Sequence, residues 1–329
     1  MTLMRAVVVG RPSATGEPLL QAVDRPVPGR GEVLLRVAFA AANWSDIQKR
    51  QGIYPDPVSY PVVLGAEASG TIVDVGGGVS RDLIGKPTAA LCGPRLVGGC
   101  AEYVAVPVSY LVPIPEGFSL ADAAAFPLAA LTAYHLLYTA HGIRRGEVVL
   151  VHAAAGSVGL ALVQLAALAG ARVIGTVGST AKQDLPRQLG AERVVDRSRE
   201  DFVAAALDAT ASRGVDLAID SLGGEILPRT FDALRPFGRL INIGEAAGEP
   251  DFPVRKKLYE RSTSMAGFEV LHAKPGSPRW RRGVRQVVAA ASAGRLTIPI
   301  GNLMPLEQIS EAHQALEGRT TQGKVVLQV

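Results

Sequence analysis

One short turn near the middle of the chain carries small residues at the spacing that phosphate binding requires. It reads Ala154-x-Gly156-x-x-Gly159, after a predicted strand over 148–152 and before an apolar helix. Small residues here let backbone N–H groups approach phosphate oxygens at the positive end of a helix. Gly159 lets the helix lie close to the strand, and Ser157 can cap the helix with its hydroxyl. The pattern predicts a dinucleotide site over Ala154, Gly156, Ser157, Val158 and Gly159; the alternative is an ordinary strand-to-helix turn.

The strand predicted over 172–176 indicates which nucleotide is bound. An NAD site usually carries an acid about 20 residues past the glycines, to hold the ribose 2′-hydroxyl. Here Ser179 and Lys182 follow the strand, and no acid appears before Asp184. A hydroxyl and an ammonium attract a 2′-phosphate, and Arg197, after the third strand, can add a second cation. NADPH is therefore the predicted cofactor, while solvated surface positions explain Lys182 and Arg197 individually almost as well.

Length and composition favour a two-domain globular protein. The 329 residues exceed one compact core of usual size, and 48% are hydrophobic. The formal net charge is only +4, and the charged residues are scattered along the chain, which argues against a nucleic-acid-binding surface. We expect no signal peptide and no membrane span, because no apolar run is long enough. Only two cysteines, Cys92 and Cys100, are present, so we expect a reducing, cytoplasmic compartment.

The chain changes texture twice. The first part reads as a small antiparallel β-barrel or sandwich, with strands predicted over 5–9, 32–40, 68–75 and 101–106. A helical stretch over 121–141, broken at Pro127, leads into alternating strands and helices. That alternation predicts a doubly wound parallel sheet, and so an α/β fold, with strands over 148–152, 172–176, 193–196, 215–221 and 239–244. After Met265 the pattern is mixed, with a helix over 278–293 and strands over 296–300 and 324–329.

Several motifs together carry a family resemblance. They are Asn43-Trp-Ser-Asp46, Gly52-Ile-Tyr54-Pro, Leu64-Gly-Ala-Glu-Ala-Ser-Gly70, Leu131-Thr-Ala-Tyr-His-Leu-Leu137, His152-Ala-Ala-Ala-Gly-Ser-Val-Gly159, Ser221-Leu-Gly-Gly224 and Arg319-Thr-Thr-Gln-Gly323. On these, the chain resembles the zinc-free quinone oxidoreductases, the zeta-crystallin-like branch of the medium-chain dehydrogenase/reductases, almost from end to end. The resemblance implies a GroES-like β-barrel domain over 1–121 and 266–329, a Rossmann domain over 122–265, an active site between them, and a homodimer.

The resemblance also bears on metal. Zinc-dependent relatives place a Cys on the loop that here spans 43–46, and a His before the Glu of the segment Gly65-Ala66-Glu67. This chain has Ala66 there, and its five histidines show no metal-ligand spacing. We therefore expect no metal.

The resemblance places Asn43 and Tyr54 beside the nicotinamide and the substrate. Either side chain can donate a hydrogen bond to a developing enolate or quinol oxygen. The alternatives are that Asn43 caps a helix beginning near Ser45 and that Tyr54 anchors a loop. Asp46 and Gln48 are expected in the substrate pocket; Gln48 replaces a Tyr of relatives, and Asp46 can instead serve as an acid at a helix N-terminus.

Further cofactor contacts are implied by the same resemblance. Thr132 is expected near the nicotinamide, with Ile243 and Gly244 at the end of the fifth strand. Arg319 is expected to approach the phosphates. Arg197 replaces a Tyr of relatives, and its planar guanidinium can both stack on adenine and pair with a phosphate.

The predicted activity is hydride transfer from NADPH to a quinone or to the β-carbon of an α,β-unsaturated carbonyl. Without a Lewis acid, alcohol oxidation is disfavoured. Two alternatives stay open. One is an enoyl-thioester reductase, since polyketide enoyl-reductase domains share the turn and the Asn-x-x-Asp region. The other is a non-enzymatic protein that binds NADPH and RNA, which would need a contiguous basic patch with exposed aromatics.

Overall fold

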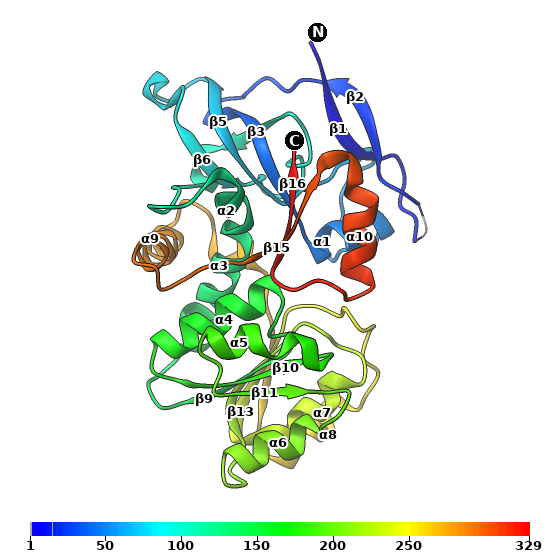
Figure 1. The fold of residues 1–329 in the computed structure, drawn as a ribbon, viewed down its shortest axis with the longest axis vertical. Coiled ribbons are helices and arrows are strands. Elements are labelled where there is room, and N and C mark those ends of the chain that lie inside the picture. Colours follow the sequence, from blue (N-terminus) through cyan, green and yellow to red (C-terminus); the bar gives the residue numbers. More distant parts are fainter. Residues whose placement is uncertain (1, 15) are drawn as a thin grey trace. The chain divides into compact units, whose positions relative to one another are not determined.

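The structure is a computed structural model that describes residues 2–14 and 16–329 (Figure 1). Two compact units make up the chain. Unit 1 comprises Met1–Ala129 with Lys274–Val329, and unit 2 comprises Ala130–Ala273. The sequence predicts a domain over residues 122–265 within a second domain over 1–121 and 266–329. That division into independently folding domains stays a prediction. No helix in the described residues is long and apolar enough to cross a bilayer.

Unit 1 is built on two sheets whose strands bury alternate or continuous apolar residues. The larger sheet has the order β15-β16-β3-β5-β6-β8, with β7 also paired to β3, and the smaller has the order β2-β1-β4. All pairs are antiparallel except β15 with β16. The strands are β1 (Leu3–Val9), β2 (Leu19–Asp24), β3 (Glu32–Ala42), β4 (Val62–Val63), β5 (Glu67–Val75), β6 (Pro87–Leu91), β7 (Tyr103–Pro107), β8 (Leu111–Val112), β15 (Ile300–Pro305) and β16 (Lys324–Gln328).

Two helices of unit 1, α2 and α9, begin at residues whose side chains cap them. Ser119 and Asp122 form a capping box at the start of α2, and Ser277 accepts from the Trp280 N–H at the start of α9. Pro127 ends the preceding helix and occupies the first position of α3, where its missing N–H costs no hydrogen bond. The helices are α1 (Trp44–Gln51), α2 (Leu120–Ala125), α9 (Pro278–Ser292) and α10 (Ile309–Glu317), while α3 (Pro127–Tyr134) begins in unit 1 and ends in unit 2.

Unit 2 holds the doubly wound sheet that the alternating pattern predicts. Its six parallel strands have the order β11-β10-β9-β12-β13-β14, so the strand order reverses between β9 and β12. In Figure 1, α4 and α5 lie on one face of this sheet and α6, α7 and α8 on the other. The elements are β9 (Val148–Val151), α4 (Ser157–Leu168), β10 (Arg172–Val177), α5 (Asp184–Gln188), β11 (Arg193–Asp196), α6 (Phe202–Ala209), β12 (Val215–Asp220), α7 (Ile226–Ala233), β13 (Leu234–Asn242), α8 (Val254–Glu260) and β14 (Ser264–Gly267).

The structure has short strands that the sequence prediction lacks, namely β2, β4, β6 and β8 in unit 1 and β14 in unit 2, and it places one predicted strand elsewhere. The sixth strand, β14, was not foreseen, because it has only four residues and none is fully buried. The strand predicted over 296–300 is wrong: the strand of this region is β15, which begins at Ile300. Leu296 and Ile298 are buried, but they pack as irregular chain and pair with no strand, which their apolar character alone could not reveal.

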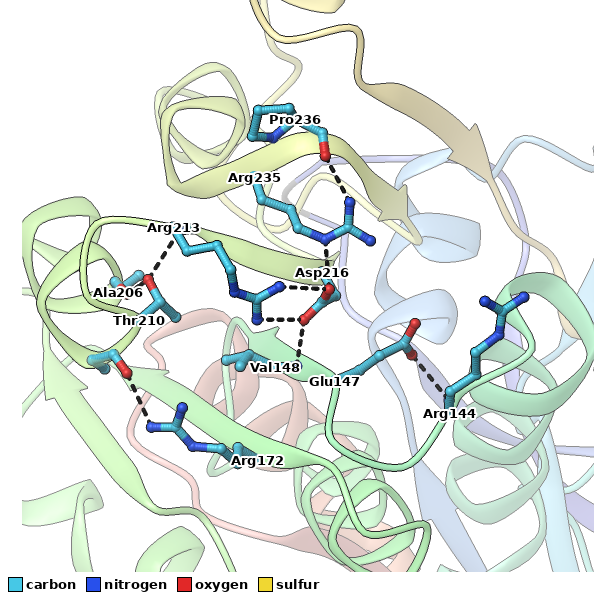
Figure 2. Close-up of polar contacts among 12 residues, drawn as sticks. Arg144, Glu147, Val148, Arg172, Ala206, Thr210, Arg213, Asp216, Arg235 and Pro236 are labelled. Atoms are coloured by element: carbon cyan, nitrogen blue, oxygen red, sulfur yellow. Dashed lines mark hydrogen bonds and ion pairs between the residues drawn. The ribbon is translucent and has the colours of Figure 1, made fainter.

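At the edge of the unit 2 sheet where its strands begin, one carboxylate ties three strands together (Figure 2). Asp216 accepts from the Val148 N–H at 2.7 Å, from both terminal nitrogens of Arg213, and from Arg235 Nε at 2.6 Å. Burial alone would raise the pKa of Asp216, but these hydrogen bonds outweigh it and lower the pKa to about 2. This contact therefore holds β9, β12 and β13 at the edge opposite the nucleotide turn.

Candidate functional site

The turn after β9 presents the start of a helix, as the sequence predicted. The Ala154 N–H donates to the Thr176 carbonyl at 2.9 Å, which fixes the turn to β10. Gly156 has extended dihedrals and is the N-cap of α4, so Ser157 is the first helical residue. The prediction that the Ser157 hydroxyl caps the helix is therefore wrong, because Ser157 follows the N-cap position instead of occupying it. The first N–H groups of α4, at Ser157, Val158 and Gly159, have no partner within the helix and mark its positive end.

Glycine is required at one position of the turn and merely permitted at another. A Cβ on Gly159 would lie 2.4 Å from the Ala153 carbonyl oxygen, so only glycine lets α4 pack this closely on the turn. A Cβ on Gly156 would meet only that same oxygen, at 3.3 Å. Gly156 therefore leaves open space beside the helix N-terminus, of the kind a phosphate oxygen needs.

The departure of Ala154 from the usual glycine is matched on the neighbouring strand. A Cβ on Gly175 of β10 would lie 2.8 Å from the Ala154 Cβ. The methyl group of Ala154 thus occupies the space that Gly175 leaves empty.

The structure brings the expected cations together beyond the end of β10. Arg197 Nη1 donates to Thr176 Oγ1 at 2.7 Å. Burial, and secondarily the positive charge of Arg197, lower the pKa of Lys182. Ser179 immediately precedes the short 3-10 turn that contains Lys182, and the Lys182 N–H donates to the Ser179 carbonyl. Two cations that repel one another at the carboxyl edge of a parallel sheet form a site suited to an anion.

A buried carboxyl group that the sequence analysis did not single out lies at the same edge. Asp220, the last residue of β12, is 0% exposed, and its Oδ1 accepts from the Leu222 and Gly223 N–H groups. Its Oδ2 has no hydrogen-bond partner among the described residues. Burial is the main cause that raises the pKa of Asp220 to about 6. The signal that could have found it is an acid at the carboxyl end of a strand beside the strand-order reversal.

Ile243 and Gly244 follow β13, as expected, and are held beside Asp220. The Ile243 N–H donates to the Asp220 carbonyl at 2.8 Å, and the Asn242 side chain donates to the Gly244 carbonyl at 3.1 Å. Thr132, on the part of α3 that belongs to unit 2, is half-buried.

In unit 1, the Asp46 carboxylate holds the backbone at Asn43 and Gly65. Asp46 is 1% exposed, and its two carboxylate oxygens accept from the Asn43 and Gly65 N–H groups at 3.0 and 3.2 Å. Burial raises the pKa of Asp46, although the charge of Lys49 opposes this effect. Asp46 thus occupies the position of an acid in the first turn of α1, which is the alternative considered for it.

The side chain of Asn43 is held at both ends. Asn43 is the N-cap residue of α1, and its Nδ2 donates to the Ala41 carbonyl and to Glu67 Oε1. Its Oδ1 accepts from Lys324 Nζ at 2.5 Å. Because an amide nitrogen has two hydrogens, both are already used. Donation from Asn43 to a substrate oxygen would require one of these bonds to be released.

The partner of Asn43 is a buried ion pair that the sequence analysis missed. Lys324 Nζ lies 2.5 Å from Glu67 Oε1, with side chains 3% and 0% exposed. The other Glu67 oxygen accepts from the Leu128 N–H at 2.8 Å, in the first turn of α3. Across residues 2–14 and 16–329, no cluster of three or more His, Cys, Asp or Glu side chains is placed to hold a metal. Only the pairing of β16 with β3 could have indicated that Lys324 approaches Asn43.

The remaining candidates of unit 1 are Tyr54, Gln48 and Arg319. Lys49 Nζ lies 4.5 Å from the centre of the Tyr54 ring and donates to the Leu96 carbonyl, so the ring is packed against a buried ammonium. Gln48 is half-buried on α1, and its carbonyl accepts from the Ile53 N–H. Arg319 is exposed, with a left-handed backbone (φ 54°), in the loop between α10 and β16.

Comparison with known proteins follows the same division. Residues 29–116 match the family of alcohol dehydrogenase GroES-like domains, and residues 157–308 match the family described as zinc-binding dehydrogenase. A 2-haloacrylate reductase of Burkholderia sp. is 33% identical over 308 residues, which cover 91% of each chain. A probable quinone oxidoreductase of Schizosaccharomyces pombe is 32% identical over 96% of this chain and 94% of its own. The chain belongs to the quinone oxidoreductase branch of the medium-chain dehydrogenase/reductases.

Solved structures of this family share the fold over nearly the whole chain. The quinone oxidoreductase of Escherichia coli in complex with NADPH has a TM-score of 0.91 at 27% identity and covers 99% of this chain and 100% of its own. A mycobacterial protein in complex with NADPH has a TM-score of 0.91 at 30% identity, with the same coverage. The Rossmann sheet and the GroES-like unit expected from the sequence are confirmed.

Proposed function

We propose that this protein is an NADPH-dependent oxidoreductase that delivers hydride to a quinone or to the β-carbon of an α,β-unsaturated carbonyl compound. The observation that carries the proposal is that two cations, Lys182 and Arg197, lie close together at the carboxyl edge of the parallel sheet. They lie beside the glycine turn at which α4 begins. The relatives named as quinone oxidoreductase and 2-haloacrylate reductase support the proposal.

The residues of unit 2 fit this cofactor. The turn over 154–159 would hold the diphosphate with the N–H groups of α4, where the absence of a Cβ on Gly156 leaves room. The 2′-phosphate would pair with Lys182 and Arg197 beside Ser179. Thr132, Ile243 and Gly244 would line the nicotinamide end. Outside unit 2, we propose Arg319 as a further phosphate contact. When bound, NADPH supplies the hydride and its two electrons.

The chain itself supplies orientation and a hydrogen-bond donor. We assign the donor role to the Tyr54 hydroxyl, which stabilises the oxygen that becomes negative as the acceptor is reduced. Asn43 acts with Asp46 to fix the loop that carries α1, because its amide is engaged on both sides. Gln48, on the same helix, contributes to the wall of the acceptor pocket.

We propose further that the reaction needs no metal. Position 66 is Ala, and the ammonium of Lys324 lies against Glu67 and Asn43, where its positive charge opposes a second cation. Metal analysis of purified, active protein tests this: we expect less than about 0.1 zinc per chain and full activity after a chelator. Stoichiometric zinc whose removal abolishes turnover would refute the metal-free reaction.

One alternative substrate has specific support. A phenolphthiocerol/phthiocerol polyketide synthase protein of Mycobacterium tuberculosis is 31% identical over 93% of this chain, which covers 14% of that longer protein. A reductase of enoyl thioesters would use the same hydride transfer and the same donor. Substrate comparison, rather than cofactor binding, separates the two.

The test has two parts. Titration should show NADPH binding at least about tenfold tighter than NADH, equivalent to about 1.4 kcal/mol. NADPH consumption should then be measured against quinones, enones, alkenals and enoyl thioesters. Equal affinities for the two nucleotides would refute the cofactor assignment. Tight NADPH binding without turnover of any acceptor would refute the enzymatic role and favour a binding protein.

We also propose a homodimer in the cytoplasm. Strand β14 pairs only with β13 among the described residues, which leaves one edge of the unit 2 sheet for a second copy. Cys92 and Cys100 are free and buried, as in a reducing compartment. Light scattering after size-exclusion chromatography should give twice the 34.4 kDa chain mass; a monomer would contradict the dimer.

A further inference from the structure

A chain of hydrogen bonds runs through the sheet edge of unit 2 from a buried histidine to Arg197. His152, the residue directly after β9, contacts Thr230 Oγ1 through Nε2 at 2.9 Å and Thr176 Oγ1 through Nδ1 at 2.8 Å. Arg197 Nη1 donates to the same Thr176 hydroxyl at 2.7 Å. At the other end, the Thr230 hydroxyl donates to the Ile226 carbonyl at 2.8 Å. The four side chains come from β10, from α7 and from the residues that directly follow β9 and β11.

The direction of every bond in this chain follows from counting protons. A hydroxyl has one hydrogen, and that of Thr230 is given to Ile226, so Thr230 must accept from His152 Nε2–H. With its hydrogen on Nε2, a neutral imidazole has an acceptor at Nδ1, which receives the Thr176 hydroxyl hydrogen. The lone pairs of Thr176 Oγ1 then face Arg197 Nη1, which can only donate.

The surroundings of His152 keep the ring neutral. The side chain is buried, with the Phe202 ring edge-to-face at 4.9 Å. Burial, and secondarily the positive charge of Arg197, lower the pKa of His152 to about 3. The ring therefore holds one proton and one tautomer across the physiological range.

We propose that His152 is a positioning residue for cofactor selection: through Thr176 it fixes the Arg197 guanidinium that receives the ribose 2′-phosphate, an inference that rests on the proposed NADPH dependence. The backbone of Thr176 accepts from the Ala154 N–H of the phosphate turn. One residue thus links the diphosphate turn to the 2′-phosphate cation. Because Arg has many rotamers, a fixed partner reduces the conformational entropy lost when the phosphate binds.

Thr176→Val tests the link, since it removes the hydroxyl at nearly constant volume and keeps the backbone carbonyl. We expect its affinity for 2′,5′-ADP to fall about tenfold and its affinity for 5′-AMP to change less than about twofold. Thr230→Val, which releases the other side of His152, should act in the same direction with a smaller effect. Thr176→Ser restores the hydroxyl and should restore the preference.

The matched control is Thr88→Val in unit 1, where a buried hydroxyl donates to backbone carbonyls. It should lower thermal stability without changing the ratio of the two affinities, which separates selection from general destabilisation. If Thr176→Val keeps the wild-type ratio, the inference fails while the NADPH proposal stands. Equal affinity of the unsubstituted protein for 2′,5′-ADP and 5′-AMP would overturn both.

Nitrogen-15 NMR of the histidine rings provides a readout that stability alone does not move. We expect the His152 ring to be neutral with its hydrogen on Nε2 from about pH 5 to pH 8. The Thr230→Val variant should show a mixture of tautomers. A hydrogen on Nδ1, or a charged ring in this range, would refute the bond directions on which the inference depends.

Discussion

At the scale of single residues, the count of donors and acceptors constrains the role of Asn43. The sequence resemblance gave both the same role, since both can donate to a reacting oxygen. In the structure, the two amide hydrogens of Asn43 are committed to Ala41 and Glu67. Tyr54 packs its ring face against the Lys49 ammonium, and we propose its hydroxyl as the hydrogen-bond donor to the reacting oxygen.

Tyr54→Phe should therefore lower turnover with a quinone or enone by about 100-fold, the cost typical of losing one donor to a developing oxyanion. NADPH affinity should not change, because the cofactor residues of unit 2 are intact. Steady-state kinetics and fluorescence titration measure the two quantities. Tyr103→Phe, on β7 beneath Arg25, is the matched control and should leave both unchanged. Normal turnover of Tyr54→Phe would remove Tyr54 from the mechanism.

Asp220 should make the protein less stable as pH rises. Its folded pKa of about 6 exceeds the ordinary value of 3.8, so the folded state binds more protons between these values. The free energy of unfolding should consequently fall by up to about 3 kcal/mol between about pH 4 and pH 6. Asp220→Asn should remove this dependence and unfold at higher denaturant concentration at pH 8. If the variant is less stable than wild type at pH 8, other interactions offset the cost of burying the ionised Asp220 carboxylate, and the prediction fails.

At the scale of elements, the sequence predicted those parts of the fold that local pattern determines. Five strands of unit 2 and the break at Pro127 follow from apolar runs and from the chemistry of proline. Strand β14 and the start of β15 do not, because short, half-exposed strands are specified by their neighbours. For the same reason Lys324 was missed: its place beside Glu67 comes from strand pairing across most of the chain.

The pairing of Ala154 with Gly175 makes a prediction about the nucleotide turn. Gly175→Ala should destabilise unit 2 by about 1–3 kcal/mol, because its new methyl group would meet that of Ala154. Ala154→Gly removes the collision, so the double variant should recover most of the loss. Denaturant unfolding of the four proteins gives the coupling free energy. Additive losses would show that the two methyl groups do not compete for one space.

At the scale of the whole molecule, the two units can be observed separately. Both tryptophans of the chain, Trp44 and Trp280, belong to unit 1. Their fluorescence therefore reports unfolding of unit 1, whereas far-ultraviolet circular dichroism reports both units. The carboxylate of Asp216 lies in unit 2, where it ties the starts of three strands (Figure 2).

Asp216→Asn should lower the stability of unit 2 by about 2 kcal/mol at neutral pH, given a folded pKa of about 2 against an ordinary 3.8. In the wild type this contribution is present above about pH 4 and is lost as pH falls towards 2. We expect an earlier transition in circular dichroism and an unchanged one in tryptophan fluorescence. Two transitions that shift together would show that the units unfold as one.

The position of β16 in the large sheet of unit 1 has a consequence for synthesis. This strand pairs with β3, joining Leu327 to Ala40, although all of unit 2 is encoded between them. On the ribosome, unit 2 can therefore fold while unit 1 still lacks the inner strand β16. Until residue 328 emerges, the backbone groups of β3 over residues 39–42 lack this partner strand. Nascent protein is most exposed to aggregation or chaperone capture during that interval.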